Sequence, residues 1–114
     1  MNTTQQVIEG AITLLKEKGW TQGAGARDAK GNRVSETNPE ATCYCLVGAL
    51  SVSARSLPGS TDDTYFNARN RVGDVLWRRG SQIGLTTFND QEERKVEDVI
   101  ELLESAKDKE VSNG

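Results

Sequence analysis

The chain has 114 residues, a length that suits one hydrophobic core and is too short for two. Apolar residues make up 35% of it and charged residues 27%, which is a globular rather than a disordered composition. No apolar run approaches the roughly 20 residues that cross a bilayer, and the start MNTTQQ lacks the pattern of a signal peptide. We therefore expect one cytoplasmic domain over residues 1–114, without a membrane segment and with reduced cysteines.

Charge is distributed unevenly, although the net charge is only −3. Residues 89–114 hold nine acids and four bases, a net charge of −5. Residues 1–88 hold eight acids and ten bases, a net charge of +2. This balance argues against nucleic-acid affinity of the whole protein but leaves a local arginine surface open.

The sequence contains no histidine. This excludes Ser-His-Asp and Cys-His catalysis and removes the commonest ligand of transition metals. A structural zinc site would need two ligands more than the two cysteines supply. We expect no metal and no cofactor, and the composition favours a protein that is not an enzyme.

Residues 3–18 are predicted to form the first helix, which Gly19 would end. Thr3 and Gln6 have the spacing of a capping box. The apolar residues recur at helical spacing and form one stripe: Val7, Ile8, Ala11, Ile12 and Leu15.

The glycine-rich stretch that follows contains the turn signal DAKGN. It predicts either a small β-hairpin, pairing about Gln22–Arg27 with Arg33–Glu36, or a mobile loop. A phosphate-binding loop is not expected, because the sequence has neither GxGxxG nor GxxxxGK[ST] there.

A central helix is predicted to start at Asn38-Pro39 and to run to about Ala54, because Asn38 can cap it and Pro39 suits its first position. It has no charged residue from Ala41 to Ala54, so other helices should surround it. Glycine inside a helix costs about 1 kcal/mol relative to alanine. Gly48 is therefore expected where a backbone or a large ring comes close, with Trp20 or Trp77 preferred.

Cys43 and Cys45 would point about 200° apart on that helix, so they could share neither a metal nor a disulfide. The favoured interpretation is that both are structural, with Cys45 inert on the apolar stripe. The alternative is a reactive thiol at Cys43, which would lie in the first helical turn, where a thiolate is stabilised.

Two more helices are predicted after residue 60. The first runs from about Asp63 to Arg79, between a cap at Thr61 or Asp62 and a stop at Gly80. After a connector, the second starts at Asn89 or Asp90 with Phe88 as a hydrophobic staple, and the tail 110–114 should fray. Its buried stripe would comprise Val96, Val99, Ile100, Leu103 and Ala106.

Five arginines are the candidate binding residues: Arg27, Arg69, Arg71, Arg78 and Arg79. Those from 69 to 79 do not fall on one helical face, and Asp74 can pair with Arg71 or Arg78. A solvated, salt-bridged helix surface is therefore the favoured interpretation. A patch for nucleic acid or an acidic partner is the alternative.

The elements together predict a compact, mainly α fold of about four helices, with a small hairpin or loop after the first. The predicted core comprises Trp20, Leu46, Leu50, Phe66, Leu76, Trp77, Val99 and Leu103.

Four motifs resemble a small family of bacterial and phage proteins, domain-of-unknown-function family 6197. They are Gly19-Trp20, the arginine-bearing loop Gly23–Arg27, the segment Cys45–Leu50, and Phe88-Asn89-Asp90 ahead of an acidic helix. Phe88 stands where the family usually has tryptophan. The resemblance covers most of the chain and implies a fold and a bacterial or phage origin, without a mechanism.

The leading functional hypothesis is a non-enzymatic interaction protein, phage or bacterial, that binds a host or phage macromolecule. This hypothesis has two grounds. The sequence shows no set of residues typical of a catalytic site, and residues 1–88 and 89–114 carry opposite net charges. The second is a nucleic-acid-associated protein that uses the arginines of residues 69–79. The third is a small ligand-binding domain or enzyme with Cys43, Arg27 or Asp90 near a pocket.

Overall fold

A computed structural model describes residues 2–109 of the chain. Within this range there are five helices: α1 (Thr3–Glu17), α2 (Leu46–Arg55), α3 (Asp62–Arg78), α4 (Leu85–Asp90) and α5 (Val96–Lys109). The mainly α prediction is confirmed, but the expected count of four helices was wrong because the predicted connector contains α4. The predicted frayed tail, 110–114, lies outside the described residues.

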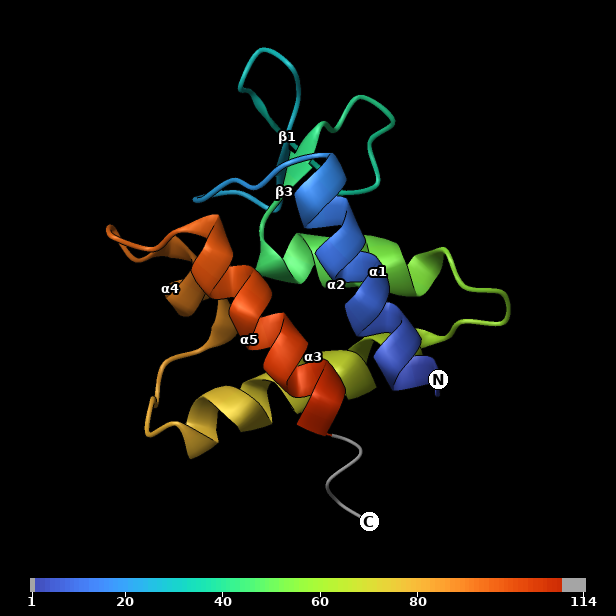
Figure 1. The fold of residues 1–114 in the computed structure, drawn as a ribbon. Helices are drawn as coiled ribbons and strands as arrows, with labels where there is room; N and C mark the ends of the chain where they lie inside the picture. The colour runs from blue at the N-terminus through green and yellow to red at the C-terminus, as the bar shows by residue number, and fades with distance from the viewer. Residues whose placement is uncertain (1, 110–114) are drawn as a thin grey trace.

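The helix α1 packs against α2, α3 and α5, and the strands gather at one end of this helical body (Figure 1). All five residues of the predicted stripe of α1 are buried. The capping box lies one residue earlier than predicted, since Asn2 rather than Thr3 caps the helix. The Asn2 side chain accepts from the Gln5 backbone N–H at 2.8 Å, and the Gln5 side chain accepts from the Asn2 N–H.

The helices α1 and α2 approach each other closely where Gly10 faces Ser53. The Ser53 hydroxyl donates to the Val7 carbonyl across the two helices at 2.6 Å. A Cβ atom at Gly10 would lie less than 3.0 Å from this hydroxyl oxygen. The glycine therefore sets the distance between the two helices, a role that its sequence context did not indicate.

Three two-residue strands form an antiparallel sheet in the order β2-β1-β3. They are β1 (Ala26–Arg27), β2 (Arg33–Val34) and β3 (Cys43–Tyr44). The pairing of β1 with β2 confirms the hairpin alternative for this segment, with shorter strands than predicted. The third strand was not predicted.

The start of α2 corrects the predicted start of the central helix, because α2 begins at Leu46 rather than at Asn38-Pro39. Asn38 does cap a turn, accepting from the Glu40 N–H at 2.8 Å. The chain then leaves helical geometry because its backbone pairs with distant residues. The Thr42 N–H donates to the Arg27 carbonyl at 2.8 Å, and the Cys45 N–H donates to the Gly25 carbonyl at 3.0 Å.

The core confirms five of the eight predicted residues, since Leu46, Leu50, Leu76, Val99 and Leu103 are buried. Trp20 is only half-buried. Phe66 is 46% exposed and Trp77 is 62% exposed, so their placement in the core was wrong. The buried face of α3 is formed by small and aliphatic side chains, Ala68, Val72, Val75 and Leu76. The two aromatic residues lie off this face.

Gly48 has a different neighbour from the one expected. A Cβ atom there would lie less than 3.0 Å from the backbone oxygen of Gly25, and neither tryptophan is among its nearest contacts. The expectation of a close backbone was right, and the preference for Trp20 or Trp77 was wrong.

Among residues 2–109, no helix has the length and apolar character needed to cross a membrane.

Candidate functional site

A buried asparagine connects three separated parts of the chain. Asn89 is fully buried and lies in α4, so the prediction that it caps the last helix was wrong; α5 begins later, at Val96. Its side-chain oxygen accepts from the Trp20 indole N–H at 2.7 Å and from the Leu46 N–H at 3.0 Å. Its amide nitrogen donates to the Thr21 carbonyl at 3.1 Å and to Asp90 at 2.9 Å. Every hydrogen-bonding position of this amide is therefore used.

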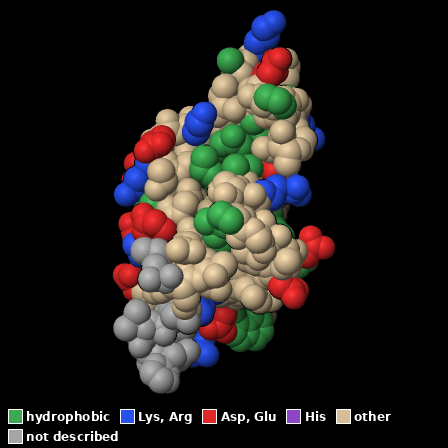
Figure 2. Space-filling view, turned by 90° about the vertical axis from the view of Figure 1, so that its right-hand side faces the viewer, with side chains coloured by type: hydrophobic (Ala, Val, Ile, Leu, Met, Phe, Trp, Pro, Cys, Tyr) green, Lys and Arg blue, Asp and Glu red, His purple; other side chains and the backbone are tan. Residues whose placement is uncertain are grey.

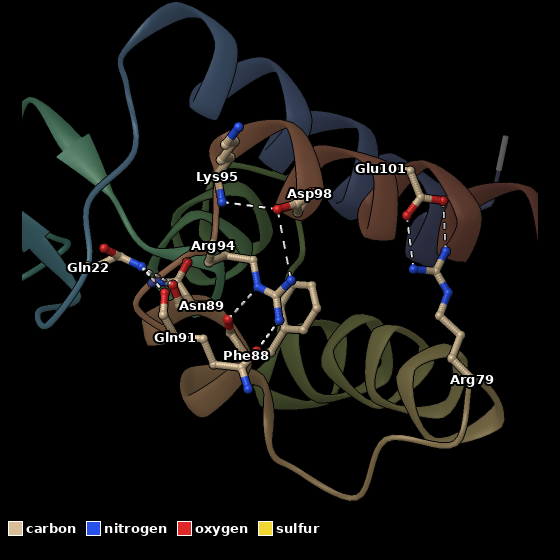
Figure 3. A network of polar contacts seen from close by, with 9 residues as sticks. All are labelled: Gln22, Arg79, Phe88, Asn89, Gln91, Arg94, Lys95, Asp98 and Glu101. Atoms are coloured by element: carbon tan, nitrogen blue, oxygen red, sulfur yellow. Dashed lines mark hydrogen bonds and ion pairs between the residues drawn. The ribbon is translucent and has the colours of Figure 1, made fainter.

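The residues around Asn89 extend this network toward α5 (Figure 3). The Gln22 side-chain amide donates to the carbonyls of Asn89 and Gln91, both at 2.9 Å. Arg94 donates to the Phe88 carbonyl, and its guanidinium carbon lies 3.7 Å from the centre of the Phe88 ring. These contacts fix α4 between the loop after α1 and the start of α5. We call Asn89 and its direct partners the Asn89 cluster.

Next to this cluster lies an open groove of about 760 Å³. It is bounded by the loop 23–25, one side of α2 along its length, the first turns of α3, and α4. Its polar lining comprises Glu36, Ser51, Arg55, Ser60, Thr61, Asp62, Tyr65, Thr86 and Asp90. Apolar surface comes mainly from Val47, Ala54 and Phe66. A hollow of this size with a mixed lining is typical of a binding site for a small molecule.

One wall of the groove carries a chain of side-chain hydrogen bonds. The Arg55 guanidinium donates to the Ser51 hydroxyl at 3.2 Å, and this hydroxyl donates to a Glu36 carboxylate oxygen at 3.3 Å. On another side, one oxygen of Asp90 accepts from the Gly23 N–H at 3.0 Å and from Asn89. The carboxylates of Glu36 and Asp90 are thus held in place by groups of the protein.

The N-terminus of α2 meets the groove, but its first N–H groups are already bonded. The Leu46 N–H donates to Asn89, the Gly48 N–H donates to the Cys45 sulfur at 3.2 Å, and the Ala49 N–H donates to the Cys45 carbonyl. Burial raises the pKa of the Cys45 thiol, so its neutral form is favoured. The expected place of Cys45 on the apolar stripe of a helix was wrong, because Cys45 is the N-cap of α2 and lines the groove, and its low reactivity stays a prediction.

Aromatic side chains at the start of α3 complete the lining. Tyr65 and Phe66 contact each other, with ring centres 5.0 Å apart and planes tilted by 59°. Tyr65 is half-buried, and burial raises the pKa of its phenol, which keeps it neutral. Phe66 leaves 46% of its surface exposed beside the groove.

Cys43 and Arg27 do not line the groove. Cys43 lies in β3, so the first helical turn that was expected to stabilise its thiolate is absent there. Arg27 holds the glycine-rich loop together, donating to Thr21 at 2.9 Å and to the carbonyls of Gly31 and Gln22, both at 3.0 Å. The reactivity of Cys43 and the binding role of Arg27 stay predictions without support from these positions.

The arginines of α3 and its end do not converge on one site. Arg78 pairs with Asp74 at 2.9 Å, as the helical spacing allowed. Arg79 forms two hydrogen bonds with Glu101 on α5, at 2.9 and 2.8 Å. Arg69 is exposed and Arg71 is half-buried. Basic and acidic side chains are interspersed on the face shown in Figure 2.

Of the three residues that the sequence suggested near a pocket, Cys43, Arg27 and Asp90, Asp90 alone lines the groove. Glu36, Ser51, Arg55 and Phe66 were missed because they come from different elements and have no fixed spacing. The nearest signal was Gly48, which approaches the Gly25 backbone closely and lines the groove together with it. Within residues 2–109, no group of three or more histidine, cysteine or acidic side chains could hold a metal ion.

The family comparison agrees with the resemblance seen in the sequence. A model of a family of unknown function, DUF6197, matches residues 1–109. The chain belongs to this family. Its sequence motifs meet in space, since Trp20, Leu46 and Asn89 are joined by hydrogen bonds. No curated protein and no solved structure matches the chain.

Proposed function

We propose that this domain binds a small molecule in the groove between the loop 23–25, α2, α3 and α4, without catalysing a reaction. The observation that carries the proposal is the groove itself. It offers about 760 Å³ of open volume beside an exposed aromatic ring and several polar side chains. A binding role fits these features because apolar contact area supplies affinity and a few placed polar groups supply orientation.

Hydrogen bonds within the protein hold the polar side chains that line the groove, and the groove itself stays open. Glu36, Ser51 and Arg55 are connected to one another, and Asp90 is held by the Asn89 cluster. A ligand would therefore meet side chains that are already ordered, which lowers the entropic cost of binding. The Ser51 hydroxyl, which donates to the Glu36 carboxylate, also accepts from Arg55, so it belongs to this fixed network.

A fragment screen by protein NMR tests this proposal. We expect fragments that bind to shift the amide signals of Gly25, Gly48 and Phe66 together. A screen without any binder, or with all shifts on other faces, would contradict it.

Two neighbouring substitutions provide the matched pair. Thr86 lines the groove from α4, whereas Thr87 is exposed and does not line it. Thr86→Trp should fill the groove and abolish the binding of the fragments found, and Thr87→Trp should leave it unchanged. Equal binding by both variants would place the ligand elsewhere.

A second function, binding of a macromolecular partner in a bacterial or phage setting, is favoured by Trp77. This residue is 62% exposed on α3, and exposed tryptophans are enriched at protein interfaces. Arg69, on the same helix, lines a smaller hollow of about 270 Å³ with Ile83 and Leu85. A pull-down with the wild type and with Trp77→Ser would test it, because a partner bound here should be lost from the variant. A partner retained equally by both would contradict this use of α3.

A further inference from the structure

We propose that the ligand of the groove is an organic cation, an amine attached to an aromatic or aliphatic group. This inference deepens the proposed function and rests on it. It follows from four properties of the groove: its charge, the state of its helix ends, the spacing of its carboxylates and its aromatic rings.

The charged side chains that line the groove have an excess of acids. Glu36, Asp62 and Asp90 are carboxylates, and Arg55 is the only base among the lining residues. Arg55 donates to Ser51 in the same network as Glu36. The hydrogen bonds that the Asp90 carboxylate accepts from the Gly23 N–H and from the Asn89 side chain both go to the same oxygen, Oδ1. The groove therefore has negative charge to offer, and a cation is the complementary ligand.

Helix N-termini often bind anions, but at this groove the first amides of α2 are bonded to the protein, and the first turn of α3 carries acidic residues. The first amides of α2 donate to Asn89 and Cys45, as described above. At the start of α3, the first turn already carries the carboxylates of Asp62 and Asp63, and Thr61 is the N-cap. A phosphate or a carboxylate ligand would find few free donors and would meet like charges.

The carboxylates are distributed around the groove rather than gathered at one point. Glu36 lies near Gly25, Asp62 starts α3, and Asp90 ends α4. A metal ion needs several oxygen ligands within about 2.6 Å, and within residues 2–109 no such group is present. An extended organic cation can place its charged group beside one carboxylate and its body along the apolar wall.

The aromatic pair supplies a surface for that body. Phe66 is 46% exposed beside the groove and contacts Tyr65. An aromatic face attracts a cation as well as an apolar group, so either end of an amine ligand can pack there. The groove thus combines the two features by which proteins recognise amines, carboxylates and aromatic rings.

Three probes of one length test the inference: 4-phenylbutylamine, 4-phenylbutanol and 4-phenylbutyrate. They share the phenyl group and the chain, and near neutral pH they carry a positive charge, no charge and a negative charge. Binding is measured by titration with NMR detection at low ionic strength. We expect the amine to bind about tenfold more tightly than the alcohol, and the acid to bind most weakly.

Glu36→Gln and Glu97→Gln form the matched pair. Glutamine at position 36 retains an oxygen that can accept from Ser51 and removes the charge. Glu97 is exposed on α5 and does not line the groove. We expect Glu36→Gln to weaken amine binding about fivefold or more without changing alcohol binding, and Glu97→Gln to change neither.

The possible results separate the inference from the proposed function. Binding of the alcohol or the acid in the groove with an affinity equal to or above that of the amine overturns the inference alone. Amine binding that Glu36→Gln and Glu97→Gln weaken equally also overturns it. Absence of binding by all three probes overturns the inference. The same absence in the fragment screen overturns the proposed function too.

Discussion

The Asn89 cluster and the groove beside it use polar residues in opposite ways. In the cluster, Asn89 is fully buried, and each hydrogen-bonding position of its amide has a partner in the chain. In the groove, carboxylates, hydroxyls and a guanidinium face an open volume. The comparison indicates that the first set holds the fold together, whereas the second is available to a ligand.

Asp90 belongs to both regions. It accepts from Gly23 and Asn89 on the side of the cluster, and it also lines the groove. Its position in the groove is therefore set by the cluster. Breaking the cluster should unfold or loosen the protein, whereas changing the polar side chains that line the groove outside the cluster should affect binding and leave stability nearly unchanged.

The largest expected effect is that of Asn89→Ala. The substitution removes the acceptor of the Trp20 indole N–H and of the buried Leu46 N–H, and it leaves the Thr21 carbonyl without its donor. Unsatisfied buried groups cost about 1–3 kcal/mol each, so we expect a loss of about 2–4 kcal/mol in the free energy of unfolding. Urea denaturation measures it.

Asn67→Ala is the control for this substitution. Asn67 is exposed on α3, and its replacement should change the free energy of unfolding by less than about 0.5 kcal/mol. Similar losses in the two variants would contradict the special role of Asn89.

Gly48→Ala and Gly73→Ala should change stability in opposite directions. Both glycines lie inside helices. A Cβ at position 48 would collide with the Gly25 backbone, so we expect a loss of about 1–3 kcal/mol. A Cβ at position 73 meets no atom within 4 Å, and alanine there should add up to about 1 kcal/mol.

Thermal unfolding of the two variants checks this prediction. Because Gly48 and Gly25 line the groove, Gly48→Ala should also alter ligand binding, whereas Gly73→Ala should not. A stabilised Gly48→Ala variant would show that the Gly25 backbone does not pack against α2.

The sequence predicted those parts of the fold that depend on local periodicity. The stripe of α1 is buried as expected, and so are Val99, Leu103 and Ala106 of α5. Gly80 ends α3 with a positive φ of 90°, the left-handed conformation that favours glycine. In each case the signal and the structure lie within one helix.

The remaining features depend on contacts between distant segments. Asn38 carries a helix-start signal, but the pairing of residues 42–45 with residues 19–27 limits it to one turn. Asn89 looked like a cap because it precedes acidic residues, and its true partners are 43 and 69 residues away. Trp77 shows that a large apolar side chain is no proof of a core position, because its helix already has a complete aliphatic face.

The smallest expected effect concerns the exposed pair Arg79–Glu101, which connects α3 to α5 (Figure 3). The hydrogen bond from Arg79, followed by that from Ser105, lowers the pKa of Glu101. A lowered pKa in the folded state means that the pair stabilises the protein above the ordinary pKa of the carboxyl. This contribution is lost as the pH falls through the folded-state value.

Arg79→Ala should therefore raise the pKa of Glu101 toward its ordinary value, which an NMR titration of this carboxyl measures. Both side chains are more than a third exposed, so the loss of stability at neutral pH should be only about 0.5 kcal/mol. The difference between variant and wild type should shrink in acid. An unchanged Glu101 pKa would contradict the role given to Arg79.

The most direct test of the contrast between the two regions is the affinity of Glu36→Gln for 4-phenylbutylamine, with its urea unfolding recorded on the same sample. The account predicts that binding weakens about fivefold or more while the free energy of unfolding stays within about 0.5 kcal/mol of the wild type. Unchanged amine affinity together with a large loss of stability would contradict it, because Glu36 would then serve the fold rather than a ligand.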